Sequence, residues 1–202
     1  ISLETAKQVN KVLNRGFKTF ICEPNNDLIQ KIKTFKPDLI FNALHGRFGE
    51  DGYIQSILEK LKIKYTHSGV ISSFLAMNKI LSKEIFIKNN ILTPKFIKFS
   101  FNNNQKISTK LIKKIEERLK FPVVIKPINE GSSVDVYICT KKNLITNLKK
   151  LKKYTEIIIE SYIAGREIQV AILGKKKLGA IELKPKRKFY DLSLIHISEP
   201  TR

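Results

Sequence analysis

FPVVIKPINEGSSVDV, residues 121–136, joins an apolar run to a lysine and to a short loop that contains glycine and serine. The apolar run predicts a buried strand, and Lys126 stands at its end. A lysine there can hold a phosphate as a compact point charge. Because Gly131 permits close approach of the backbone, the loop can offer N–H groups and the hydroxyls of Ser132 and Ser133 to phosphate oxygens. The spacing is not that of the Walker A motif, and the local sequence alone leaves open a phosphate-binding loop of another kind or a purely structural turn.

The segments before this stretch alternate between strand-like and helix-like patterns. Apolar residues at helical spacing predict helices, and short apolar runs predict strands. In the first 65 residues we expect helices at residues 3–15, 27–35 and 54–61 and strands at residues 18–22 and 39–44. This order is typical of a small parallel α/β domain.

The remainder of the chain mixes further helices with more closely spaced strands. We expect one or two helices over residues 72–89, helices at residues 111–119 and 142–153, and strands at residues 96–99, 122–126, 136–139, 157–160, 168–173 and 178–183. The predicted fold class is therefore α/β, with an α+β character after the first domain.

The composition favours a folded domain with a basic surface. Of the 202 residues, 42% are hydrophobic and 28% charged, so the chain can bury a core. The formal net charge of +20 could signal a nucleic-acid partner. The lysines are spread along the chain, however, without an arginine-rich block or interleaved aromatic residues for base stacking. We expect a solvated lysine surface and no nucleic-acid partner, and a basic nucleic-acid-binding protein stays as the distant alternative.

The pattern of apolar residues argues against a membrane protein. The sequence has no run of 18 apolar residues, and its N-terminus lacks the basic and apolar regions of a signal peptide. Cys22 and Cys139 lie far apart without metal-ligand spacing, so we expect free thiols in a reducing compartment. The sequence thus predicts a cytoplasmic protein without a membrane partner.

A second motif with chemical content is HGRFGEDG, residues 45–52, which follows a predicted strand. A histidine at a strand end, followed by glycines and acids, suits a substrate loop at the carboxyl edge of a parallel sheet. The same glycines suit a tight structural turn that carries an exposed histidine. The local sequence leaves both interpretations open.

Together the two motifs resemble those of the D-alanine–D-alanine ligase family of the ATP-grasp superfamily. Residues 45–52 match the family pattern H-G-x-x-G-E-D-G, and YTHSGVISSFLAMNKILSK, residues 65–83, is similar to Y-T-G-S-G-x-x-x-S-x-x-x-x-D-K-x-x-x-K. Three residues depart from the family: His67 and Asp135 replace glycines, and Asn78 replaces an aspartate. A carboxylate at position 135 would repel a phosphate unless it points away from it.

The resemblance implies roles for residues that match the family motifs. Its catalytic residues would be His45 near the first D-alanine, Ser132, which helps to orient that substrate, and Tyr190, which begins the mobile substrate loop. Its ATP-binding residues would be Lys79 and Lys126 at the phosphates, Ser133 in the loop over the triphosphate, Glu160 at the adenine amino group, the backbone of Ile163 at the adenine ring, and Glu167 at the ribose hydroxyls.

The resemblance also implies a domain organisation. We expect an N-terminal α/β substrate domain at residues 1–80, lacking its first strand, a central ATP-grasp subdomain at residues 81–165, and the start of the C-terminal ATP-grasp domain at residues 166–191. The family motif that begins with Phe-Tyr-Asp breaks off after Asp191. We expect residues 192–202 to be an artefactual tail without a function.

The activity implied is that of an ATP-dependent ligase that joins two D-alanines through an acyl phosphate for peptidoglycan synthesis. The nearest alternative is a D-alanine–D-lactate type or another ATP-grasp carboxylate–amine ligase. ATP and Mg²⁺ are the implied cofactors, and no residue of this chain is assigned as a metal ligand, because the metal carboxylates are expected in a missing C-terminal part. We therefore expect the chain to be inactive alone, and the whole protein to be a homodimer that acts on small molecules.

Overall fold

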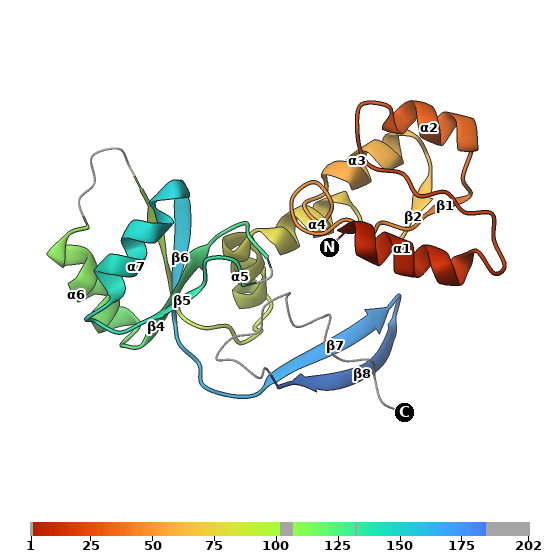
Figure 1. Ribbon diagram of the computed structural model, residues 1–202. Helices are drawn as coiled ribbons and strands as arrows, with labels where there is room; N and C mark the ends of the chain where they lie inside the picture. The colour runs from red at the N-terminus through yellow and green to blue at the C-terminus, as the bar shows by residue number, and fades with distance from the viewer. Residues whose placement is uncertain (1, 102–106, 132, 185–202) are drawn as a thin grey trace. The chain divides into compact units, whose positions relative to one another are not determined.

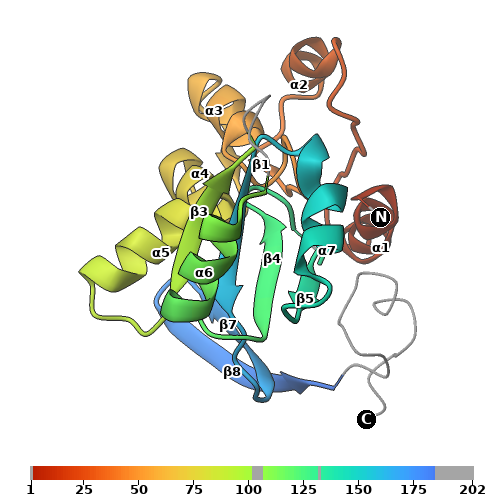
Figure 2. The same ribbon diagram turned by 90° about the vertical axis from the view of Figure 1, so that its left-hand side faces the viewer.

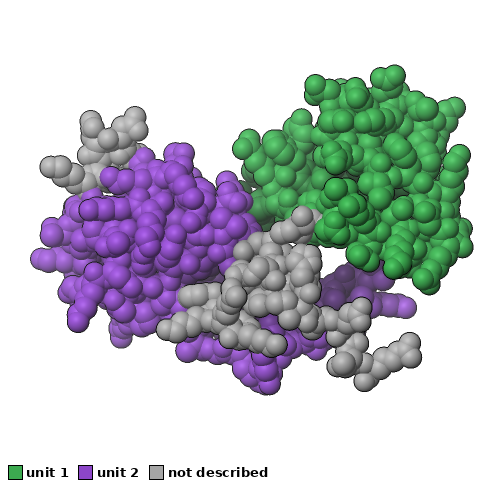
Figure 3. Space-filling model, in the orientation of Figure 1, with its two compact units in different colours: residues 1–82 green, residues 83–202 purple. Residues whose placement is uncertain are grey.

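The computed structural model describes residues 2–101, 107–131 and 133–184. The chain divides into two compact units, residues 1–82 and residues 83–202 (Figure 3). Each unit has its own hydrophobic core. Within the described ranges, none of the helices combines the length and the apolar character needed to cross a bilayer.

The first unit packs helices around a short two-stranded sheet. Its elements are α1 (Ser2–Leu13), α2 (Leu28–Phe35), β1 (Leu39–Ile40), α3 (Tyr53–Lys60), β2 (Lys64–Tyr65) and α4 (Val70–Met77). β1 and β2 pair in parallel, and Ile32, Ile54 and Leu58 form a small core beside them. The predicted parallel α/β order of this part is confirmed.

One predicted strand of this unit is wrong, and another is shorter than expected. Residues 18–22, all of them described, form no strand, and the strand expected at residues 39–44 is reduced to Leu39–Ile40. A strand persists only where a neighbour satisfies its backbone groups, and β1 pairs with β2 alone in the described part of this unit. Phe20 is accordingly 52% exposed and stacks on Phe35 instead of lying in a sheet.

The second unit is built on a four-stranded antiparallel sheet. The strands β3 (Phe96–Ser100), β4 (Val123–Pro127), β5 (Tyr137–Cys139) and β6 (Glu156–Ser161) lie in the order β3-β6-β4-β5. One face is covered by α6 (Thr109–Arg118), α7 (Leu144–Lys150) and the short 3-10 helix η1 (Leu151–Lys153). On the opposite face lies α5 (Lys79–Lys88), as Figures 1 and 2 show. The predicted strands at residues 96–99, 122–126, 136–139 and 157–160 are confirmed.

Strand alternation decides which side chains reach this core. Val123 and Ile125 of β4 and Ile157 and Ile159 of β6 pack with residues of α6 and α7. Because successive side chains point to opposite faces of a sheet, Lys126 and Glu160 fall on the other face. The core is completed by Ile97, Phe99, Ile115, Leu119, Cys139, Leu144, Leu148 and Leu151.

The last described elements are β7 (Glu167–Leu173) and β8 (Lys176–Leu183), which form an antiparallel hairpin. Gly174 begins its two-residue turn with a φ of 59°, a conformation that glycine adopts without steric cost. Both strands were predicted by their apolar runs, and both are exposed along almost their whole length. The division of this unit at residues 165 and 166 stays a prediction.

Candidate functional site

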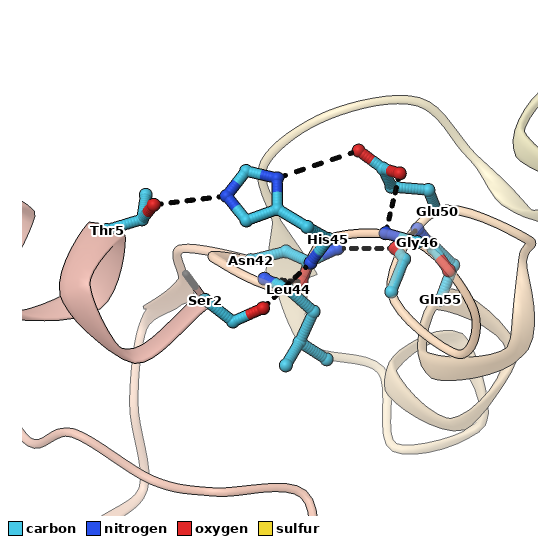
Figure 4. Close-up of polar contacts among 9 residues, drawn as sticks. Ser2, Thr5, Asn42, Leu44, His45, Gly46, Glu50 and Gln55 are labelled. Carbon is cyan, nitrogen blue, oxygen red and sulfur yellow. Dashed lines mark hydrogen bonds and ion pairs between the residues drawn. The ribbon is translucent and has the colours of Figure 1, made fainter. Parts of the chain in front are cut away.

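His45 opens the glycine- and acid-rich loop that follows β1 (Figure 4). Its Nε2 lies 3.0 Å from the Thr5 hydroxyl oxygen of α1, and its Nδ1 lies 3.9 Å from Glu50 Oε1. Its backbone N–H donates to the Ser2 hydroxyl at 3.1 Å. The side chain of His45 is nevertheless 38% exposed, so the ring is oriented from two sides and accessible to a small molecule.

The two acids of this loop bind its backbone. Glu50 Oε2 accepts a hydrogen bond from the N–H of Gly46 at 2.7 Å. Asp51 accepts from the N–H of Phe48 at 2.9 Å and from the N–H of Tyr53, at the start of α3, at 3.0 Å. These contacts hold the backbone of residues 46–53 in one conformation directly after His45.

Two buried amide side chains hold the same loop from within. Asn42 Nδ2 and Gln55 Nε2 both donate to the carbonyl oxygen of Gly49, at 2.8 and 2.7 Å (Figure 4). Gly52 has a φ of 92°, and a Cβ at this position would stand 2.7 Å from the carbonyl oxygen of Val70. A side chain at residue 52 would therefore be strained and would also collide with the backbone. The loop is a rigid element.

The segment after β2 contains the first departure from the family pattern. His67 has a φ of 78°, the left-handed conformation in which glycine is free of strain. Its Nδ1 lies 2.8 Å from the Thr66 hydroxyl oxygen, and its ring packs edge-on against Phe41. Desolvation, and after it a hydrogen bond to Glu59, raises the pKa of the neighbouring Tyr65 to about 12. The turn at His67 is thus stabilised by side-chain contacts with Thr66 and Phe41.

Lys79 is the first residue of α5, which crosses the boundary between the units. The helix begins with a side-chain cap, because Asn78 Oδ1 accepts from the N–H groups of Ile80 and Leu81 at 3.0 and 3.1 Å. Asn78 is itself extended, with φ −87° and ψ 106°, and so separates α4 from α5. The asparagine keeps the capping oxygen of an aspartate and lacks its charge.

We expect Asn78→Ala to lower the free energy of unfolding by about 1 kcal/mol, because two amides of the first turn lose their acceptor. Asn78→Asp should keep both bonds and add about 0.3–1 kcal/mol from the helix dipole. Asn89→Ala, at the exposed far end of the same helix, is the control, with an expected loss of less than about 0.5 kcal/mol. Urea denaturation measures all three, and equal losses for the two alanine variants would contradict the capping role.

Glu160 is the centre of a buried ion-pair cluster. Its Oε1 lies 2.9 Å from Lys83 Nζ, and its Oε2 lies 2.5 Å from Lys126 Nζ. The side chains of Lys83 and Glu160 are only 6% and 7% exposed, whereas that of Lys126 is 23% exposed. Lys83 Nζ also donates to the Thr93 hydroxyl at 2.6 Å and lies 5.2 Å from the ring centroid of Phe96.

The strand register explains why these groups meet. Val124 of β4 is directly opposite Glu160 of β6, so Lys126 is its diagonal neighbour on the same face. Lys83 reaches this face from α5. Lys126 and Glu160 are therefore brought together, although the family resemblance implies that Lys126 binds the phosphates of ATP and Glu160 its adenine. Lys83 was missed as a site residue, and the signal was its place as the last lysine of the family pattern over residues 65–83.

The loop after β4 is tightly turned in its described part. The N–H of Val134 donates to the carbonyl of Gly131 at 3.0 Å, and the N–H of Val136 donates to that of Ser133 at 3.4 Å. Ser133 and Asp135 both have a positive φ, of 59° and 54°. Ser132 lies outside the described residues, so its predicted role stays a prediction, as does that of Ser133.

The other predicted ATP contacts follow β6. Ile163 is exposed in the segment that leaves this strand, and Glu167 is the exposed first residue of β7. No contact among the described residues connects either side chain with Glu160, and both roles stay predictions. Tyr190 lies outside the described residues, as does the expected tail at residues 192–202.

The described residues offer no cluster of three or more histidine, cysteine, aspartate or glutamate side chains that could hold a metal ion. Cys22 and Cys139 are both free thiols, the second of them buried. The described donor set therefore does not fit a magnesium site.

Two family models match this chain. Residues 22–68 match the one described as "D-ala D-ala ligase N-terminus", and residues 85–199 match the one described as "D-ala D-ala ligase C-terminus". The second match extends into the segment expected to be an artefactual tail, whose interpretation stays a prediction.

Curated relatives show the same likeness. The chain is 65% identical over 192 residues to the D-alanine–D-alanine ligase of Pelagibacter ubique, covering 95% of this chain and 62% of that protein. It is 42% identical over 194 residues to that of Wolbachia pipientis wMel, covering 95% of this chain and 59% of that protein. The chain thus spans about three fifths of the length of these relatives.

Solved structures agree with the fold. The D-alanine–D-alanine ligase from Bacillus anthracis superimposes with a TM-score of 0.81 at 34% identity, covering 95% of this chain and 62% of that one. The same enzyme complexed with ATP superimposes with a TM-score of 0.78 at 32% identity, covering 93% and 62%. These neighbours confirm the predicted mixed α/β fold of the ATP-grasp type.

Proposed function

Because this chain belongs to the D-alanine–D-alanine ligase family, we propose that it carries the first substrate site and part of the ATP site of an enzyme that joins two D-alanines. In the proposed reaction the terminal phosphoryl group of ATP is transferred to the carboxylate of one D-alanine. The amine of the second D-alanine attacks the resulting acyl phosphate and loses a proton, and phosphate leaves as the peptide bond forms. The dipeptide would serve peptidoglycan synthesis.

The observation that carries this proposal is the buried Glu160 carboxylate between two lysine ammonium groups. Each carboxylate oxygen has two acceptor positions, so Glu160 can accept from an adenine amino group while it keeps Lys83. Lys126, the more exposed of the two lysines, can turn toward phosphate oxygens as a point charge. The described residues therefore fit an adenine nucleotide, and the ATP complex of the Bacillus anthracis enzyme supports this assignment.

The contacts and exposure of individual residues suggest what each would do in the reaction. Lys126 would neutralise charge that is spread over the phosphoryl oxygens, and Glu160 would orient the base. His45, held by Thr5 and Glu50, would orient the first D-alanine through its exposed ring. Proximity and charge neutralisation are thus the main contributions of this chain to the reaction.

Further properties of the whole protein belong to the same proposal. It would act in the cytoplasm as a homodimer, with Mg²⁺ as a second cofactor beside ATP. The family match supports the ligase over the nucleic-acid-binding alternative. Size-exclusion chromatography with light scattering tests the homodimer.

A chimera tests the activity, since the chain spans only part of its relatives. Residues 1–191 replace the corresponding part of the Pelagibacter ubique ligase, to which the chain is 65% identical. We expect phosphate release that requires both ATP and D-alanine, and a dipeptide product. Product formed only when D-lactate is added would favour the D-alanine–D-lactate alternative, and no release with either substrate would reject the proposal.

We expect His45→Ala in this chimera to lower D-alanine turnover about tenfold, the loss of one hydrogen bond of about 1.4 kcal/mol, while ATP affinity stays within about threefold. The matched control is His67→Gly, which removes a histidine from the same unit at a position whose φ of 78° suits glycine. This control should keep its turnover. Wild-type turnover and D-alanine Michaelis constants in His45→Ala would instead make His45 a residue of the turn only.

A further inference from the structure

The most unusual residue beside the predicted phosphate loop is Asp135. The family pattern has a glycine here, and the backbone has kept the left-handed conformation, with a φ of 54°. Aspartate is one of the few residues other than glycine that adopt this conformation as single residues. Its side chain is only 17% exposed, so the carboxylate is not simply directed into water.

The carboxylate of Asp135 is held by three side chains. Its Oδ1 accepts from the hydroxyl of Tyr137 at 3.0 Å, and its Oδ2 accepts from the hydroxyl of Tyr154 at 2.5 Å. Lys153 Nζ lies 2.7 Å from the same Oδ2. Tyr137 belongs to β5, Lys153 to η1, and Tyr154 follows η1, so the contacts connect residue 135 with two separate elements.

The surroundings keep this carboxylate ionised without leaving its charge unbalanced. The hydrogen bond from Lys153, followed by that from Tyr154, lowers the pKa of Asp135. Lys150 adds further positive charge 5.0 Å from the ring centroid of Tyr137, and the same Lys153 ammonium that pairs with Asp135 lies 5.3 Å from the ring centroid of Tyr154. The neighbouring lysines therefore offset the repulsion between the Asp135 carboxylate and a phosphate that the sequence suggested.

The backbone next to Asp135 has little else to hold it. Residues 133–136 form a tight turn whose bonds run from Val134 to Gly131 and from Val136 to Ser133. Val134 is 46% exposed and Val136 is only partly buried, so apolar burial contributes little to anchoring the turn. In the described structure, the side-chain contacts that connect these four residues with β5 and η1 are those of the Asp135 carboxylate.

We propose that Asp135 is a positioning residue for the nucleotide, and that its carboxylate fastens the turn of residues 133–136 to β5 and η1. It acts through the turn and makes no contact with the nucleotide itself. A glycine at residue 135 would permit the left-handed conformation without holding it. Asp135 adopts this conformation, and the contacts of its carboxylate stabilise it. This inference rests on the proposed ATP site.

The chimera of residues 1–191 with the Pelagibacter ubique ligase serves for the test, with ATP as the probe. Asp135→Gly keeps the backbone conformation and removes the fastening. Asp135→Asn keeps the size and the tolerance for a positive φ, and it answers the question should the glycine variant not fold. Glu116→Gln is the matched control, since it breaks another ion pair of the same unit, 2.8 Å long and exposed.

Amide hydrogen exchange and ATP titration are measured on each variant. In Asp135→Gly we expect the amides of Val134 and Val136 to exchange about tenfold faster and the ATP dissociation constant to rise about tenfold. The amides of β5 should keep their rates, Asp135→Asn should fall between wild type and Asp135→Gly, and Glu116→Gln should match wild type.

The other outcomes are informative as well. Unchanged exchange at Val134 and Val136 in Asp135→Gly and Asp135→Asn would overturn the inference. Faster exchange with unchanged ATP affinity would overturn the positioning role and leave the proposed function intact. Absence of ATP binding to the chimera without these substitutions would count against the ATP site itself, and the exchange rates alone would then decide whether Asp135 fastens the turn.

Discussion

Replacing Glu160 with alanine is expected to lower the free energy of unfolding by about 3–5 kcal/mol, the usual loss when one partner of a buried ion pair is removed. The reason is the Lys83 ammonium, which is 6% exposed and, among the described residues, would keep the Thr93 hydroxyl and the face of Phe96 as partners. Lys126 would lose its partner too, but it is closer to solvent. Urea denaturation followed by circular dichroism measures the loss.

A control for Glu160→Ala lies on the same strand. Glu156 pairs with Lys98 at 2.6 Å, but both side chains are well exposed, so Glu156→Gln should cost less than about 1 kcal/mol. Similar losses for the two variants would contradict the assignment of Glu160 as a buried anchor.

A double variant separates stability from nucleotide binding. Lys83→Met with Glu160→Leu replaces both nearly buried charges with apolar side chains of similar size, an exchange that is often neutral or stabilising. We expect it to recover most of the stability lost in Glu160→Ala. ATP affinity should stay low, because the acceptor for the adenine amino group is absent. Recovery of both properties would argue against a role for Glu160 at the nucleotide.

Lys126→Ala is expected to weaken ATP binding about 10- to 150-fold, since a charge-assisted contact contributes about 1.5–3 kcal/mol. The fold should tolerate this change, because Glu160 keeps Lys83 as its partner. Isothermal titration of the chimera with ATP measures the effect.

The control for Lys126→Ala is Lys98→Ala, which removes an exposed lysine from β3 of the same sheet. The net charge of +20 attracts ATP without specificity, and salt screens that attraction over a Debye length of about 8 Å at physiological ionic strength. Titrations at low and high salt therefore distinguish the two effects. Equal losses in both variants, removed by salt, would mean that Lys126 contributes only to the general positive field.

The sequence by itself determined most of the secondary structure of the second unit. Continuous apolar runs such as the one before Lys126 predict buried strands, and β4 and β6 lie where those runs stand. The helices of the first unit also follow their apolar periodicity. The run at residues 18–22 misled the prediction, because apolar character indicates burial and cannot tell whether a neighbouring strand is available to pair with.

Part of the candidate site could also be predicted from the sequence, through its resemblance to a family. The resemblance located His45, Lys126 and Glu160 as separate motif positions, each with a role of its own. It attached no role to Lys83, since a lysine on a helix is ordinarily solvated, and only α5 packed on the sheet places this one in a nearly buried position. For Asp135 the sequence showed a carboxylate where a glycine is usual and left its direction open.

What only the tertiary structure decided is which charges meet. The antiparallel register of β4 and β6 sets Lys126 diagonally beside Glu160, and α5 adds Lys83 from another segment of the chain. In the same way, η1 and β5 bring Lys153 and Tyr137 to Asp135. Residue types and local periodicity are properties of the sequence, whereas ion pairs depend on register and on packing between distant segments, which no local pattern encodes.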